Sequence, residues 1–118
     1  MSTGGTMEGL SLATLVDEHL GIAREQESGR SSVTIHGGRE HHLRQTLIAL
    51  VEGRALGEHD SPGEATLQVL RGRVRVQAGD ESWEGAAGDY LLIPASRHDL
   101  TALDDAGVLL TVTNRLAD

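Results

Sequence analysis

The sequence predicts an all-β domain with one short N-terminal α-helix. From about Ser32 onward, apolar and polar residues alternate in short runs, which is the period of a half-buried strand. Glycine, proline and aspartate punctuate these runs at short, fairly even spacing, as in β-sandwiches and β-barrels. One earlier stretch has helical spacing instead. At 118 residues, the chain has the length of one domain with its own core.

We expect three segments along the chain. Residues 1–9 are small, polar and rich in glycine, and they predict a flexible tail. Residues 10–31 hold the helix and its connection, and residues 32–118 form the barrel.

The helix is expected from Ser11 to about Gln26. Ser11 is a suitable N-cap, and Gly29 lies where the chain can leave the helix. Its apolar residues recur at helical spacing and are Leu12, Leu15, Val16, Leu20 and Ala23. Such a stripe packs on the body of the domain, or serves as a lid or a dimer clasp, rather than carrying catalysis.

Eight strands are expected after Gly29. They are Ser32–His36, Leu43–Val51, Ala65–Leu70, Arg73–Ala78, Ser82–Glu84, Tyr90–Ile93, His98–Ala102 and Val108–Asn114. The clearest hairpin joins Arg73–Ala78 to the segment through Trp83, because Gly79-Asp80 suits a tight two-residue turn.

Composition excludes several classes of function. The net charge of −8 argues against nucleic acid and anionic membranes as partners, since both attract a cationic surface. The chain has no cysteine, which excludes disulfides and thiolate chemistry. No apolar run reaches the length of a membrane span and no signal sequence is evident, so we expect a cytoplasmic protein.

Two motifs carry a family resemblance. Gly53, His59 and Gly72 fall at the spacing of G-x5-H-x-H-x3,4-E-x6-G, and the run GDYLLIPASRH approaches G-x5-P-x-G-x2-H through Gly88 and Pro94. From about Leu43 to Thr113 the chain therefore resembles a small single-domain cupin. The resemblance implies a cupin-type jelly-roll β-barrel.

The resemblance also implies where a metal would bind. Cupins that hold a divalent transition metal (Fe, Mn, Ni, Cu or Zn) use two histidines and a glutamate of the first motif and a histidine of the second. In this register His59 and His98 keep two positions, whereas Ser61 and Ala65 replace the other two ligands. Two imidazoles alone make a poor site for a dication. The metal motif is therefore degenerate.

Other residues could complete that reduced set. Glu64 lies next to the vacant carboxylate position, and a bulge at the preceding turn would swing it inward. A histidine of the earlier strands, His36, His41 or His42, is a further candidate. The metal-binding hypothesis is therefore His59, His98 and Glu64.

A ligand cavity is the other hypothesis for the two histidines. His59 and His98 both lie where a barrel mouth is expected, so we expect them to face one shared cavity. Gln45 and Gln68 are candidates to line it, although the alternate, apolar face of the strand at Gln68 is the better barrel interior. Each histidine could instead be an ordinary strand-end residue, hydrogen-bonded to backbone.

Three functions follow from these alternatives. The first is a small-molecule-binding or sensory barrel whose ligand the sequence does not identify. The second is a metal-dependent enzyme of the dioxygenase or isomerase type with a reduced ligand set, and the third is a structural protein whose barrel is filled by side chains. The resemblance further implies a homodimer, in which Ser32–His36 adds to the partner's sheet and the helix covers an interface.

Overall fold

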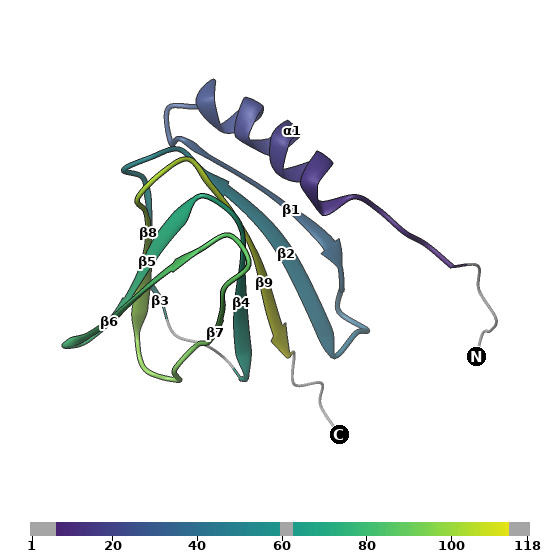
Figure 1. Ribbon diagram of the computed structural model, residues 1–118. Helices are drawn as coiled ribbons and strands as arrows, with labels where there is room; N and C mark the ends of the chain where they lie inside the picture. The colour runs from purple at the N-terminus through teal and green to yellow at the C-terminus, as the bar shows by residue number, and fades with distance from the viewer. Residues whose placement is uncertain (1–6, 60–62, 114–118) are drawn as a thin grey trace.

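The computed structural model describes residues 7–59 and 63–113, except for the side chains of Glu58 and His59 (Figure 1). One helix precedes nine strands in this part of the chain. In order they are α1 (Leu12–Arg24), β1 (Arg30–His36), β2 (Leu43–Leu50), β3 (Ala55–His59), β4 (Ala65–Arg71), β5 (Arg73–Ala78), β6 (Glu81–Ala86), β7 (Tyr90–Leu92), β8 (His98–Ala102) and β9 (Ala106–Thr113).

The strands form two antiparallel sheets that make a jelly-roll barrel. The five-stranded sheet has the order β1-β2-β9-β4-β7, and the four-stranded sheet has the order β3-β8-β5-β6. Neighbours in the sheets are mostly distant in sequence, as a jelly roll requires. The predicted fold class is confirmed. No helix in the described part is long and apolar enough to cross a membrane.

The main core lies between the two sheets. Alternation along each strand puts the apolar side chains inside, so that β4 buries Ala65, Leu67 and Val69 and leaves Gln68 exposed. Buried aliphatic residues of five further segments complete this core, namely Ile48, Leu50, Val74, Val76, Ile93, Leu100, Ala102, Ala106 and Val108. Branched aliphatic side chains can reach interior packing density without aromatic rings.

Helix α1 covers the outer face of the five-stranded sheet, mainly over β1 and β2 (Figure 1). Ser11 is its N-cap, as expected, and accepts a hydrogen bond from the amide of Thr14 at 3.1 Å. Val16 and Leu20 are fully buried against Leu47 and Ala49 of β2. The apolar stripe predicted for this helix therefore packs against the five-stranded sheet of the same chain.

Gly72 turns the chain from the five-stranded sheet into the four-stranded one. Its φ of 75° lies in the left-handed region, and a Cβ atom at this position would overlap the carbonyl oxygen of Asp105. The last glycine of the first motif is thus required by backbone conformation and by close approach. Gly72 therefore has a role in the folding of the chain.

Candidate functional site

His98 is the one buried histidine of the described residues. It begins β8, faces the core together with Leu100 and Ala102, and is 3% exposed. Its Nδ1 lies 2.9 Å from the carbonyl oxygen of Ser96. Because a carbonyl oxygen can only accept, Nδ1 carries the proton, and Nε2 is the nitrogen that can accept a hydrogen bond or bind a metal when the ring is neutral.

His59 is brought to His98 by the sheet register. β3 pairs with β8 in antiparallel fashion, and the Cα atom of His59 is the partner of the Cα atom of His98. The register shifts between Leu56 and His59, so an irregularity in β3 produces this match. The side chain of His59 and all of Ser61 lie outside the described residues.

The space beside His98 is small and apolar. A cavity of about 20 Å³ lies there, and its described lining is Ile48, Leu56, Leu67, Val76, Ile93, His98, Leu100 and Leu110. Such a volume holds about one water molecule, whereas organic ligands occupy pockets of roughly 300 Å³ or more. Among the described residues, aliphatic side chains therefore fill the barrel interior, and His98 is its polar exception.

The described residues do not fit a metal centre. Ala65, at the position of the family's glutamate, is buried and offers no donor. Glu64 is exposed, and its backbone amide is held by the hydroxyl of Thr113 at 3.2 Å, so Glu64 does not reach the interior that His98 lines. No group of three or more histidine, aspartate or glutamate residues suited to a metal occurs in the part of the chain that the structure describes.

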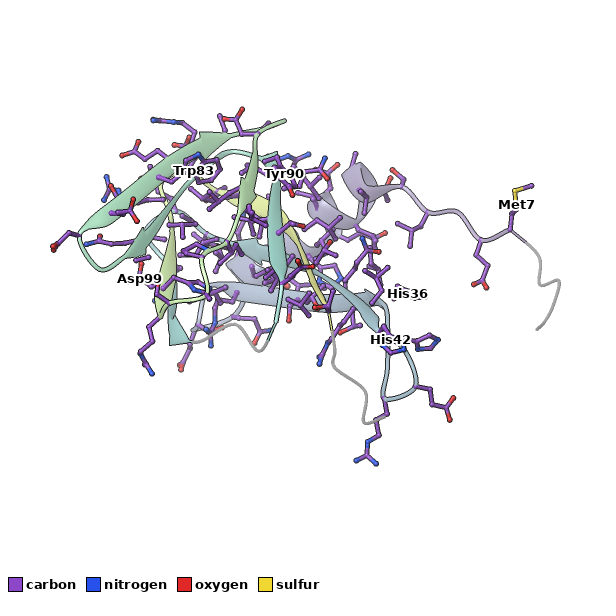
Figure 2. All side chains as sticks on the ribbon, turned by 90° about the horizontal axis from the view of Figure 1, so that it is seen from below. Met7, His36, His42, Trp83, Tyr90 and Asp99 are labelled. Atoms are coloured by element: carbon purple, nitrogen blue, oxygen red, sulfur yellow. The ribbon has the colours of Figure 1, made fainter. Side chains whose placement is uncertain are left out.

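The three histidines considered as substitutes lie on the β1–β2 hairpin. His36, His41 and His42 are all exposed, and the rings of His36 and His41 lie 5.0 Å apart. Figure 2 shows His36 and His42 on this hairpin, which projects from the body of the barrel. The hairpin histidines therefore do not complete a site at His98.

The two glutamines lie on the other face of the five-stranded sheet. Gln45 donates a hydrogen bond from Nε2 to the hydroxyl of Thr111 at 3.2 Å, on the face that also carries Leu47. Gln68 is exposed beside Leu109 and Tyr90. Neither glutamine lines the interior cavity, because strand alternation turns both away from it.

A larger hollow lies where the two sheets end side by side. β6 is an edge of the four-stranded sheet and β7 is an edge of the five-stranded sheet. A groove of about 340 Å³ is lined by residues of β5, β6 and β7 and of the segment after β7, namely Val76, Ala78, Glu81, Ser82, Trp83, Leu91, Leu92 and Pro94. We call it the open-edge groove.

Trp83 is the principal aromatic surface of the open-edge groove. Its ring is half-buried and packs against the core, and it lies directly over Gly85 two residues along β6. A Cβ atom at Gly85 would lie 2.6 Å from Cζ2 of the indole, so only glycine lets the ring rest there. Trp83 and Tyr90 are labelled in Figure 2, on the side of the barrel away from the His42 hairpin.

The sequence pattern placed Trp83 in the predicted hairpin, but it did not predict the groove. The groove depends on β6 and β7 being the edges of two different sheets, which follows from the topology and from no local pattern. The one available signal was the lone tryptophan among small and acidic residues in GDESWEGAAGD.

Comparison with known proteins agrees with this architecture. The structure is similar to a conserved protein of unknown function from Streptococcus pyogenes, with 28% identity, a TM-score of 0.69, and 78% of this chain and 80% of that chain covered. It is similar to a cupin superfamily protein from Desulfitobacterium hafniense, with 17% identity, a TM-score of 0.75 and 94% of both chains covered. KdgF from Halomonas sp. shares 20% identity, with a TM-score of 0.65 over 75% of this chain and 83% of that chain. No protein-family model and no curated protein matches the chain.

Proposed function

This chain folds as a small cupin domain, and on that premise we propose that it is a binding or sensory barrel that takes a small organic molecule in the open-edge groove. One observation carries the proposal. The groove, at about 340 Å³, has the volume of a small-molecule site, and it joins an indole and aliphatic walls to two polar side chains, Glu81 and Ser82.

The proposal moves the ligand from the interior to the opening of the barrel. Val76 lines both the open-edge groove and the small cavity beside His98, so one layer of side chains separates the two spaces. A ligand in the groove would therefore be separated from His98 by this layer and would not contact it. The backbone of His59 is paired with that of His98, so the groove is separate from the position that the two histidines share in the sheet.

Binding without chemistry is the role that this lining supports. Its described residues include no histidine, lysine or metal-binding cluster, and the hydroxyl of Ser82 has no basic side chain beside it in the groove. Activated nucleophiles need an adjacent base or a lowered pKa. The groove thus supplies shape, apolar surface and one charge.

The test is a screen of small organic molecules of mixed charge by ligand-observed NMR, with titration of each hit into the protein. We expect hits to alter the emission of Trp83, which is the sole tryptophan of the chain. Leu92→Asn should weaken their binding about tenfold whatever the charge of the ligand, because it puts a polar amide on the apolar wall. Leu43→Asn is the matched control, since Leu43 is also an exposed leucine but lies on β2, outside the groove. Hits that respond equally to both variants would refute the groove as the site.

A metal-dependent enzyme of the dioxygenase or isomerase type is the second candidate. The register that pairs His59 with His98 favours it, since two imidazoles would be the start of a transition-metal site. Against it stand Ala65 in the interior and Glu64 on the exposed side.

Metal analysis separates the two candidates. The protein is purified with and without supplementation by Fe, Mn, Ni, Cu and Zn, and bound metal is measured per chain. Near-stoichiometric metal that is lost in His59→Ala and in His98→Ala, but kept in His42→Ala, would establish the metal candidate. A protein without metal after every supplementation would remove it.

We also propose that the chain is a homodimer. β1 is the outer strand of the five-stranded sheet, so one of its edges has no strand beside it in the described chain. An edge strand of seven residues offers backbone groups that a second copy can pair with. The expected contribution of Ser32–His36 to a partner's sheet falls on this strand.

A further inference from the structure

Among the described residues that line the open-edge groove, one is charged. Of its eight described lining residues, six are apolar or aromatic, Ser82 is neutral, and Glu81 carries a carboxylate. A ligand in the groove must leave this carboxylate in contact with water or give it a partner, because an unpaired charge is costly to cover. The described lining of the groove therefore carries a negative charge.

The side chains of Glu81 and Trp83 lie close enough to contact the same group of a ligand. They are two residues apart on β6, so their side chains leave the same face of the strand. Their cross-strand partners on β5 are Ala78 and Val76, which line the groove as well. Residues i and i+2 of a strand are about 7 Å apart, so a group between them can touch both side chains.

In the part of the chain that the structure describes, no cationic side chain lines the groove beside Glu81. Arg73 and Arg75 are the nearest cations along β5, but they pair with Glu84 at 3.1 Å each. Glu84 and the two arginines lie on the opposite face of the β5–β6 hairpin, because β5 buries Val74 and Val76 toward the core. The groove lining among the described residues contains no arginine.

We propose that the open-edge groove binds a small organic cation, an ammonium compound with an apolar body. The ammonium would lie between the carboxylate of Glu81 and the face of the Trp83 ring, which attracts cations through its quadrupole. Leu91, Leu92 and Pro94 would cover the apolar body. This inference rests on the proposed function and adds the chemical class of the ligand.

The test compares three probes of nearly equal shape: 2-phenylethylammonium, 2-phenylethanol and phenylacetate. Each is titrated into the wild-type protein while Trp83 is excited at a wavelength that the phenyl ring and Tyr90 do not absorb. We expect the ammonium to bind about 5- to 30-fold more tightly than the alcohol, and phenylacetate to bind most weakly. The preference should shrink as salt is raised, because the groove is open to solvent.

Two charge-neutralising variants locate the effect. Glu81→Gln should reduce the preference for the ammonium over the alcohol at least about threefold and leave the part due to the Trp83 ring, whereas Asp80→Asn should leave the preference unchanged. Asp80 is the matched control, since it loses the same charge one residue away, in the turn of the hairpin, and does not line the groove. Circular dichroism and thermal melts establish that both variants are folded.

The outcomes distinguish the ligand class from the site. If the alcohol or the carboxylate binds as tightly as the ammonium, the cation proposal is overturned and the groove remains a binding site. If none of the three probes binds, the cation proposal is overturned as well, and the mixed-charge screen described above decides the function by itself. A preference that is as large in Glu81→Gln as in the wild type would also overturn the proposal.

Discussion

Gly85 lies on β6 beneath the indole ring of Trp83, and the absence of its side chain shapes the open-edge groove. A Cβ atom there would lie 2.6 Å from Cζ2 and 2.8 Å from Cζ3, which is closer than carbon atoms pack. The ring would have to move outward, since the other side of Gly85 is backbone of the sheet. The position of the one tryptophan thus depends on a residue with no side chain.

Gly85→Ala is therefore expected to displace Trp83 toward solvent. The emission maximum of the protein should move to longer wavelength, and the free energy of unfolding should fall by about 1 kcal/mol, the lower end of the range for overpacking, because an edge ring can swing out. Fluorescence and urea unfolding measure the two effects. Gly57→Ala is the control, since a Cβ atom there meets nothing within 4 Å. An unchanged emission maximum would contradict the packing of the ring on Gly85.

Single residues also show how far the sequence reaches toward the site. The motif spacing puts His59 and His98 in one site, and the register makes their Cα atoms partners, while a cavity shared by their side chains stays a prediction. It left open whether the interior beside His98 is filled, because filling depends on Ile48, Leu67 and Leu110 from three other strands. The sequence also left open which face of the strand at Gln68 lines the interior. The structure buries Ala65, Leu67 and Val69 and exposes Gln68, so the apolar face is the inner one.

At the scale of elements, most of the strands were readable from period-two patterns and turn residues. β5 and β8 have the predicted bounds, and the Gly79-Asp80 turn joins β5 to β6 with Gly79 at a φ of 61°. β3 was missed, because Ala55–His59 is short, contains Gly57 and has no clear alternation. β9 begins at Ala106 rather than at Val108. Gly107 resembled a turn residue, but it lies where Val16 of the helix packs closely on the strand.

The helix contains one residue that weakens it. Gly21 lies inside α1, and a Cβ atom there meets nothing within 4 Å. Gly21→Ala should raise the free energy of unfolding by about 0.5 to 1 kcal/mol, because alanine has the higher helix propensity and no space is contested. Urea unfolding followed by circular dichroism measures the gain. Gly9→Ala, outside the helix, should leave stability unchanged, and equal effects of the two substitutions would refute the propensity argument.

Asp105 connects three elements just before β9. One carboxylate oxygen accepts from the backbone amide of Glu52 at 2.9 Å, and the other accepts from the guanidinium of Arg24, at the end of the helix, at 2.9 Å. The amide of Glu52 and, after it, the guanidinium of Arg24 hold the pKa of Asp105 below its ordinary value of 3.8. The charged form is thus favoured by folding.

Asp105→Asn should lower the free energy of unfolding by about 0.5 kcal/mol at pH 7. The exposed ion pair with Arg24 is lost, whereas the side-chain oxygen of asparagine can still accept the hydrogen bond from the backbone amide of Glu52. A lowered pKa gives stability that is complete above pH 3.8 and is lost as pH falls through the lower, folded-state value. The difference between wild type and Asp105→Asn should therefore vanish in strong acid, whereas other carboxylates affect both proteins equally. Urea unfolding from pH 7 down to pH 2 measures it. A difference that stays constant with pH would contradict the role of the charge.

At the scale of the whole molecule, the two sheets leave different kinds of open edge. The open-edge groove lies beside β6 and β7, and apolar side chains and the indole of Trp83 line it. The opposite end of the five-stranded sheet is β1, whose exposed face is polar, with Ser32, Thr34 and His36. A ligand site and a pairing edge can therefore coexist without competing for the same surface.

The proposed homodimer follows from the edge at β1. We expect light scattering to give twice the 12.5 kDa mass of the chain across a wide concentration range. Thr34→Lys should shift the equilibrium to monomers, because a charge on a pairing edge opposes strand addition. Gln77→Lys, an exposed substitution on β5, is the control and should remain dimeric. Since the groove lies at the other end of the molecule, monomeric Thr34→Lys should keep its affinity for groove ligands. A monomer mass for the wild type at every concentration would rule out the dimer.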